Sequence, residues 1–356
     1  MAGKNAYTYY YIIGEVLPMQ HEIVKSAPLL DKNGCVAEPG WARGLISRYS
    51  RADIKASPIR IKEWDYYLIS NNSFALALTV ADNGYMGLIS ASVLEFEKPW
   101  EKTTSIITPF PMGKYKLPET SAKGETAYSD SRVNMRFTAE NGIRRIECVF
   151  HKFLNEETLE AELTLTDEPK ESMVIATPFE KPKAFYYNQK INCMRANGYM
   201  RLGKRVYDFG TKDSYATLDW GRGVWTYDNT WYWGNGNGTV NGHRVGFNIG
   251  YGFGDTSAAT ENVIIYDGIV HKLSNVSFNI PADSFMKPWT FSSDDGRFEM
   301  DFVPVIDRAA RTSALIIESD QHQVFGRFTG KMILDGGETI ELNNFMGFAE
   351  KVRNRY

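Results

Sequence analysis

The sequence predicts an all-β protein with antiparallel strands, and three observations support this prediction. First, side chains alternate with a period of two, as in the run from Leu159 to Leu165, where Glu160 and Glu162 mark a face turned to water. Second, turn dipeptides separate such runs, namely Asn141-Gly142, Asn241-Gly242, Asp267-Gly268 and Asp295-Gly296. Third, aromatic residues, which favour strands, make up 13% of the chain. We therefore expect a sandwich or a barrel.

The domain organisation follows from length and from one interruption of the strand pattern. A chain of 356 residues favours two domains. Pro178 and Pro182 break the alternation, and similar Trp- and Gly-containing phrases lie on both sides of them. We expect an N-terminal β domain over residues 1–188 and a C-terminal β domain over residues 189–356. Short helices are expected only near residues 21–30 and 307–312.

The charge and the distribution of apolar residues argue against partners such as nucleic acids and the membrane interior. A net charge of −3 and a pI near 6.0 lack the basic excess of proteins that bind nucleic acids. No run approaches the ~20 apolar residues that span a bilayer, and the first residues lack the pattern of a secretory signal. The expected partner is a small-molecule ligand, and the oligomeric state stays open.

Cysteine and histidine usage predicts a reducing compartment and no metal site. Cys35, Cys148 and Cys193 are odd in number and far apart, which argues against a disulfide framework and against a C-x-x-C site. The five histidines show no zinc-ligand spacing. No Walker loop, G-x-S-x-G elbow or dinucleotide-binding fingerprint occurs. We expect a cytoplasmic protein that uses no metal and no cofactor.

One hairpin can be registered from sequence alone. Asn241-Gly242 suits a two-residue type I′ turn, because both central residues of that turn need positive φ. Counting outward from this turn pairs Trp233 with Gly250 and Trp231 with Gly252, so that each indole faces a glycine. One face then carries Trp231, Trp233, Asn235, Asn237 and Asn248. This face is either the lining of a ligand cavity or part of a core in a sheet that its glycines allow to bend.

The charged residues near this hairpin are the candidate catalytic groups: Asp219, Arg222 and Glu261. Asp219 has apolar neighbours that would desolvate it, which can prepare a carboxyl group as a general acid. Arg222 lies three residues on, and we consider both that it tunes Asp219 and that the two form a structural ion pair. Glu261 is either a second carboxylate for acid–base work or the exposed start of a strand. The candidate ligand-binding residues are Trp225, Trp231, Trp233, Asn235, Asn237, Asn248, Tyr251 and Asn262.

Several motifs along nearly the whole chain resemble a bacterial family known as domain of unknown function 2804. The most specific segment is Leu218-Asp219-Trp220-Gly221-Arg222-Gly223-Val224-Trp225, followed by Trp231-Tyr232-Trp233. Lys62-Glu63-Trp64-Asp65-Tyr66, Thr260-Glu261-Asn262 and Gly347-Phe348-Ala349-Glu350-Lys351 add to the likeness.

The resemblance implies a distant relation to two-domain, lipocalin-like proteins such as carotenoid 1,2-hydratase, AttH-type proteins and certain pericyclic cyclases. It implies two tandem calycin-type barrels or half-barrels with a pocket at or between them. By analogy, Asp219 would act as the acid, and Trp225, Trp231 and Trp233 would form an aromatic wall that stabilises cationic intermediates.

Three hypotheses about function remain at this point. The first is a cofactor-independent acid–base enzyme, such as a hydratase, cyclase or isomerase, acting on a mostly apolar small molecule. The second is a noncatalytic carrier or sensor of a hydrophobic small molecule. The third is a carbohydrate-binding protein or a glycoside hydrolase that uses Asp219 and Glu261, because aromatic platforms beside polar groups also suit sugars.

Overall fold

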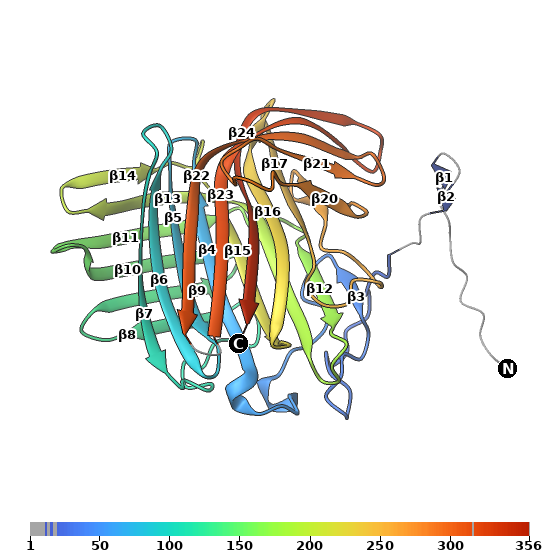
Figure 1. Cartoon of the computed structure of the whole chain (residues 1–356), viewed down its shortest axis with the longest axis horizontal. Coiled ribbons are helices and arrows are strands. Elements are labelled where there is room, and N and C mark those ends of the chain that lie inside the picture. Colours follow the sequence, from blue (N-terminus) through green and yellow to red (C-terminus); the bar gives the residue numbers. More distant parts are fainter. Residues whose placement is uncertain (1–10, 13–14, 17–19, 315–316, 356) are drawn as a thin grey trace.

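The protein is built almost entirely of strands, which confirms the all-β prediction (Figure 1). The structure is a computed structural model that describes residues 11–12, 15–16, 20–314 and 317–355. Within these residues the helices are two short 3-10 turns, η1 (Arg51–Asp53) and η2 (Pro58–Arg60). A small ribbon of β1 (Tyr11–Ile12) and β2 (Glu15–Val16) precedes two large antiparallel sheets.

The first large sheet has thirteen strands in the order β7-β6-β5-β4-β15-β13-β11-β10-β9-β8, with β12 joining β13 to β3 and β14 lying on β13. The pairing of β4 with β15 brings together the beginning and the end of this part of the chain. The strands are β3 (Gly40–Ala42), β4 (Ile61–Ser70), β5 (Phe74–Asp82), β6 (Met86–Glu95), β7 (Trp100–Pro109), β8 (Gly124–Ser129), β9 (Val133–Glu140), β10 (Ile143–Leu154), β11 (Glu157–Thr166), β12 (Met173–Pro178), β13 (Phe185–Leu202), β14 (Arg205–Phe209) and β15 (Tyr215–Val224).

The second large sheet has nine strands in the order β19-β18-β17-β16-β24-β23-β22-β21-β20. Its three longest strands follow one another in the chain and lie side by side in the sheet. The strands are β16 (Asp228–Val240), β17 (His243–Tyr251), β18 (Val263–Tyr266), β19 (Ile269–Lys272), β20 (Val276–Asn279), β21 (Trp289–Ser293), β22 (Phe298–Ala314), β23 (Ile317–Ile333) and β24 (Thr339–Arg355).

Each large sheet curls around a hydrophobic core of its own. The first core includes Phe150, Leu163 and Trp220, and the second includes Phe247 and Trp289. Along β11 the alternation predicted from sequence holds, since Leu159 and Leu163 are buried while Glu162 is exposed. Two curled half-barrels therefore carry most of the buried apolar surface.

The two sheets also pack against each other through faces that do not line these cores. In Figure 1 the long strands β22, β23 and β24 pass in front of β4 to β7. The contact contains two apolar clusters: one joins Ala75 and Ala77 to Phe325 and Phe348, and the other gathers around Trp225. Because β5 is covered on both faces, its small alanines accept the second sheet at close range.

The strands change sheets between Val224 and Asp228. The domain boundary expected at residues 188 and 189 lies inside β13, which continues to Leu202 as one strand of the first sheet. The expected helices are wrong. Residues 307–312 belong to β22, and residues 21–30 contain only isolated bridges and turns, because pairing with neighbouring strands overrides a weak local preference.

The hairpin of β16 and β17 confirms the register counted from Asn241-Gly242. Both turn residues have positive φ, 51° and 87°, and Val240 pairs with His243 and Trp233 with Gly250. The ladder ends at the pair Tyr232 and Tyr251. Trp231 therefore has no ladder partner in β17, since Gly252 at φ +89° turns the chain away.

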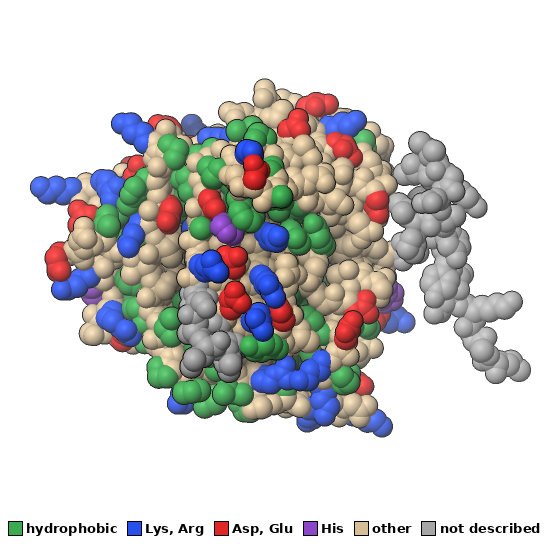
Figure 2. Space-filling model, in the orientation of Figure 1, with side chains coloured by type: hydrophobic (Ala, Val, Ile, Leu, Met, Phe, Trp, Pro, Cys, Tyr) green, Lys and Arg blue, Asp and Glu red, His purple; other side chains and the backbone are tan. Residues whose placement is uncertain are grey.

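The face shown in Figure 2 carries acidic and basic side chains close together. Near the end of β24, Arg353 and Arg355 lie within 3.6 Å of Asp228, and Arg355 also lies 3.5 Å from Glu318. On the face that Figure 2 shows, charges of both signs are mixed and form no extended basic patch. Separately, none of the helices in the described ranges is long and apolar enough to cross a membrane.

Candidate active site between the two sheets

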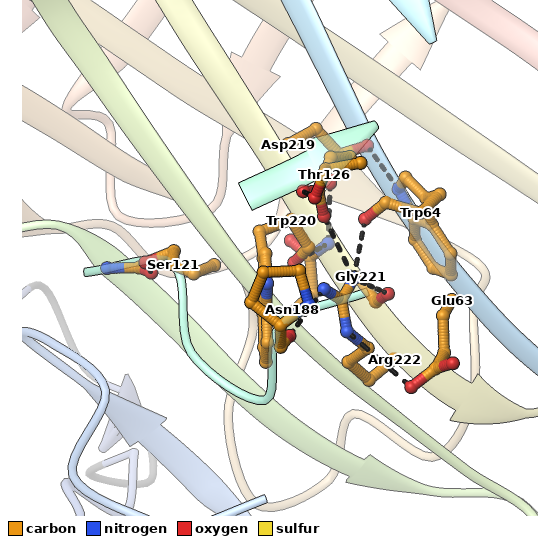
Figure 3. Close-up of polar contacts among 12 residues, drawn as sticks. Glu63, Trp64, Ser121, Thr126, Asn188, Asp219, Trp220, Gly221 and Arg222 are labelled. Carbon is orange, nitrogen blue, oxygen red and sulfur yellow. Dashed lines mark hydrogen bonds and ion pairs between the residues drawn. The ribbon is translucent and has the colours of Figure 1, made fainter. Parts of the chain in front are cut away.

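A buried ion pair lies at the contact between the two sheets. Lys190 of β13 and Asp219 of β15 are cross-strand partners, and Lys190 Nζ lies 2.8 Å from Asp219 Oδ1. Two further groups donate to the same carboxylate, Asn188 Nδ2 to Oδ1 at 2.5 Å and Trp64 Nε1 to Oδ2 at 3.1 Å (Figure 3). Three donors around the carboxyl group of Asp219 hold it in a fixed orientation.

The ammonium group of Lys190 also faces an aromatic ring of the second sheet. Its Nζ lies 4.0 Å from the ring centroid of Trp233, while the Trp233 indole donates to Asn248 Oδ1 at 2.7 Å. Lys190 is almost fully buried, so this cation–π contact operates with little screening by water. The hydrogen bond to Asn248 fixes the plane of the ring that the cation meets.

A second carboxyl group, Glu350 of β24, stands directly opposite Trp233 in the β16–β24 ladder. It accepts hydrogen bonds from Trp231 Nε1 at 3.0 Å and from Gln323 Nε2 at 2.9 Å. Burial raises its pKa to about 7, against these hydrogen bonds and the positive charges of Arg308 and Lys190, which favour the ionised form. Glu350 thus exchanges a proton close to neutral pH.

The third carboxyl group, Glu261, precedes β18. A Cβ added at Gly250 would lie 2.6 Å from Glu261 Oε1, so the glycine opposite Trp233 is what leaves room for this side chain. Glu261 Oε2 is shielded from solvent and accepts no hydrogen bond from the residues that the structure describes. Burial raises the pKa of Glu261, Asp219 raises it further, and Lys190 opposes both effects.

The three carboxyl groups therefore differ in what they can do. Within the described ranges, Asp219 forms an ion pair and Glu261 and Glu350 form none. An unpaired charge is expensive to bury, which favours the protonated form of both glutamic acids. The site combines one fixed anion, one fixed cation and two groups able to give up a proton.

Aromatic rings enclose these groups. Trp64 stacks on Tyr186 at 6.1 Å between centroids and meets Trp225 edge-on at 5.2 Å, and Trp225 lies 5.9 Å from Trp231. Gly221 faces Trp64 in the ladder, and a Cβ added there would lie 1.9 Å from the indole. The bare backbone at this position lets the ring of Trp64 cross β15 and reach Asp219.

The asparagines predicted to bind a ligand hold the sheets together instead of facing an open space. Asn192 of β13 donates to Oδ1 of Asn235 and of Asn237, both at 2.9 Å. Asn235 Nδ2 donates back to Asn192 at 3.3 Å and to Asn248 at 3.2 Å. Asn262 accepts from the Gly250 amide at 2.6 Å and donates to a main-chain carbonyl. These amides are largely occupied by protein partners.

Two predicted residues lie away from this cluster. Tyr251 stacks on Tyr232 at 4.4 Å and belongs to the core side of the second sheet. Arg222 extends away from Asp219 (Figure 3) and points into the first half-barrel. Its Nη1 donates to Asp65 Oδ1 at 3.0 Å and its Nη2 to the carbonyl of Pro118 at 2.8 Å. The predicted pairing of Asp219 with Arg222 is wrong, because residues three apart on a strand point to opposite faces.

Sequence reasoning missed Lys190 and Glu350 as members of the site. Lys190 lies in a polar stretch, Asn188-Gln189-Lys190, at a position where β13 is buried on both faces. The residues next to Lys190 in the sequence do not indicate this burial, because the covering strands come from distant parts of the chain. Glu350 lies in the motif Gly347–Lys351, yet no residue next to it in the sequence marks it as buried. No group of three His, Cys, Asp or Glu side chains in the described part of the chain is arranged to hold a metal ion.

Fold and site together define a two-unit, lipocalin-like protein with a buried polar centre between its half-barrels. Among solved structures, an AttH-type protein from Nitrosomonas europaea shares this fold, with a TM-score of 0.53 and 11% identity over 91% of this chain and 98% of the other. The chain belongs to the family described as domain of unknown function DUF2804, whose model matches residues 20–356.

Two further solved structures are similar at a lower level. Kievitone hydratase from Nectria haematococca has a TM-score of 0.44 and 9% identity, over 83% of this chain and 88% of the other. CghA with Sch210972 has a TM-score of 0.46 and 10% identity, over 92% of this chain and 97% of the other. A search of curated proteins found no match.

Proposed function

We propose that this protein is an acid–base enzyme that acts, without a cofactor, on a small and mostly apolar molecule, as a hydratase, cyclase or isomerase does. The observation that carries the proposal is the Lys190–Asp219 ion pair set beside two carboxyl groups of raised pKa, all inside an aromatic enclosure. Carboxyl groups whose pKa is raised by an apolar setting are common in enzyme sites that transfer protons.

Within this proposal the roles follow from the hydrogen bonds. Glu350, with a pKa of about 7, transfers the proton, because a general acid works best when its pKa lies near the working pH. Asp219 accepts from two hydrogen-bond donors and forms the ion pair with Lys190, so it serves as the group that orients Lys190, in place of the acid role expected from sequence. The ammonium group of Lys190 stabilises negative charge that develops on the substrate, and the indole faces stabilise positive charge.

The alternatives make different use of the same site. A carrier would need only the aromatic enclosure. A glycoside hydrolase would need Asp219 and Glu261 on either side of an open groove, and the side chain of Asp219 is only 11% exposed. The buried and aromatic setting favours an apolar ligand over a sugar. We also propose a reducing, cytoplasmic setting, because Cys35, Cys148 and Cys193 are free thiols.

The decisive experiment compares wild-type protein with Glu350→Gln on a small-molecule extract of the source organism, followed by untargeted mass spectrometry. Wild type should deplete a compound and yield an isomer or a product that differs by one water. Glu350→Gln should slow this turnover at least about 100-fold while the protein stays folded. Glu341→Gln, an exposed change on the same strand, is the matched control.

Two results would count against the proposal. Full turnover by Glu350→Gln would remove Glu350 from the chemistry. A wild-type protein that converts nothing, yet releases a bound apolar compound when it is denatured, would establish the carrier instead.

A further inference from the structure

Phe253 closes the aromatic enclosure from a surface loop. It lies between β17 and β18 in Gly252-Phe253-Gly254, and its ring is only 8% exposed although Gly252 beside it is exposed. The ring meets four others edge-on: those of Tyr186 at 4.8 Å, Trp225 at 4.9 Å, Phe179 at 5.1 Å and Trp231 at 5.2 Å between centroids. A single phenyl ring from the loop thus fills the centre of the aromatic group.

The backbone around Phe253 is built to turn. Gly252 has φ +89° and Gly254 has φ +77°, a region that other residues rarely adopt. The nearest main-chain bonds of the loop are from the Asp255 amide to the carbonyl of Pro178 at 2.7 Å and from the His21 amide to the carbonyl of Ala258 at 2.9 Å. These two hydrogen bonds hold the loop after Gly254. The segment that carries the Phe253 ring lies before them, between two glycines whose backbone angles can change at little cost.

The rings that Phe253 touches are the ones that lead to the charged groups. Trp231 donates to Glu350, and Tyr186 stacks on Trp64, which donates to Asp219. A group that took the place of the Phe253 ring would therefore lie against Trp225 and Trp231, with its far end directed toward the Lys190–Asp219 ion pair and the carboxyl group of Glu350.

We propose that Phe253 holds the place of the substrate, and that the ligand is a flat molecule with an aromatic or conjugated ring and a polar group at one end. Its ring replaces that of Phe253 against Trp225, Trp231 and Tyr186 when the segment Gly252–Gly254 swings outward. Edge-to-face packing on three fixed aromatic walls selects a flat ring over a saturated one, because the ring edges carry the matching partial charge. This inference rests on the proposed function, since it assigns a substrate class to the same site.

The test uses two probes of equal carbon skeleton, 2-naphthol and decahydro-2-naphthol, with binding measured by calorimetry and by quenching of tryptophan fluorescence. Phe253→Ala should bind 2-naphthol about ten-fold more tightly than wild type, because the guest no longer has to displace the ring of Phe253 from Trp225, Trp231 and Tyr186. For decahydro-2-naphthol, the gain in affinity of Phe253→Ala over wild type should be smaller. Phe345→Ala, which opens a comparable space in the core of the second sheet, is the control and should show no gain for either probe.

Hydrogen exchange on the wild-type protein tests the same inference and does not depend on whether Phe253→Ala folds. Saturating 2-naphthol should increase hydrogen exchange at the amides of residues 252–254 in wild type, because the ring of Phe253 is displaced. Equal affinity of wild type and Phe253→Ala, or a gain shared by Phe345→Ala, overturns the inference, and so does unchanged exchange in that segment when Phe253→Ala fails to fold.

The outcomes also separate this inference from the proposed function. If Phe253→Ala gains affinity for 2-naphthol but wild type converts no compound, the ring site stands and the enzyme proposal fails. If Glu350→Gln abolishes turnover but Phe253→Ala gains nothing, the enzyme proposal stands and the ring site fails.

Discussion

Lys190 controls the electrostatics of the buried centre because it is the cation that faces all three of its carboxyl groups. Its direct ion pair is with Asp219 at 2.8 Å, and its charge also favours ionisation of Glu261 and Glu350. Arg308 adds positive charge at Glu350 and Lys272 at Glu261, yet burial outweighs these cations at both groups. The consequence is that the pKa of both glutamic acids is raised, which is the property an acid–base site requires.

The raised pKa of Glu350 predicts a specific dependence of stability on pH. Folding lifts this pKa from 4.5 to about 7, so between these values the folded state holds a proton that the unfolded state has released. Stability attributable to Glu350 therefore falls as pH rises from 4.5 to 7, by about 3 kcal/mol in total, and stays level beyond that range. Urea unfolding of wild type and Glu350→Gln at several pH values measures the difference.

The control for this prediction is Glu341→Gln, which is exposed and should track wild type at every pH. A stability difference between wild type and Glu350→Gln that does not change from pH 4.5 to 8 would mean that burial does not shift the proton equilibrium of Glu350.

At the scale of elements, β15 shows how a single strand serves two environments. Trp220 and Arg222 point into the first half-barrel, while Asp219 and Gly221 face the second sheet. The alternation keeps the Arg222–Asp65 pair, which braces the inside of the half-barrel, apart from the Lys190–Asp219 pair of the proposed site. Gly221 completes the arrangement by letting the indole of Trp64 lie across the strand.

Gly221→Ala is expected to damage both packing and the site. The new Cβ would lie 1.9 Å from the ring of Trp64, so the indole has to move and lose its hydrogen bond to Asp219. Overpacking of this kind costs about 1–3 kcal/mol. Chemical denaturation measures the loss, and Gly44→Ala, where no atom lies within 4 Å of the added Cβ, is the control and should shift stability by less than about 0.5 kcal/mol. Equal effects of the two substitutions would show that the close approach at Gly221 is not constraining.

At the scale of the whole molecule, the two half-barrels depend on each other. Their contact buries apolar clusters that include Trp225 and Phe348, and it contains the amide network in which Asn192 of the first sheet bonds to Asn235 and Asn237 of the second. Separating the sheets would expose these clusters and leave the amides without partners. The candidate active site exists only while the sheets are together, because Lys190 and Asp219 come from one sheet and Glu350 from the other.

Splitting the chain tests this dependence. Two fragments divided at residue 226, where the strands change sheets, should bind a hydrophobic dye when expressed alone and should co-purify as a complex when expressed together. Fragments divided between residues 188 and 189 cut through β13 and should not reassemble. Dye-free, monomeric fragments from the split at 226 would show that each half-barrel folds independently of the other.

Much of the fold was determined by the sequence itself, since it depends on local rules. Period-two alternation identified the strands, Asn241-Gly242 set the register of β16 and β17, and the pairing of Trp233 with Gly250 followed from that count. The stretch from Asp219 to Trp233 does contribute to the buried centre. These features follow from backbone geometry within a few residues, which a sequence displays directly.

Only the tertiary structure decided which charged residues meet. The pairing of β13 with β15 places Lys190 beside Asp219, and the packing of β24 against β16 brings Glu350 to Trp231 and Trp233. Arg222, adjacent in sequence, faces away, while Glu350, more than a hundred residues distant, joins the cluster. The physical reason is that alternation assigns a side chain to a face, but the contents of that face, and the burial that shifts a proton equilibrium, come from strands brought together across the whole chain.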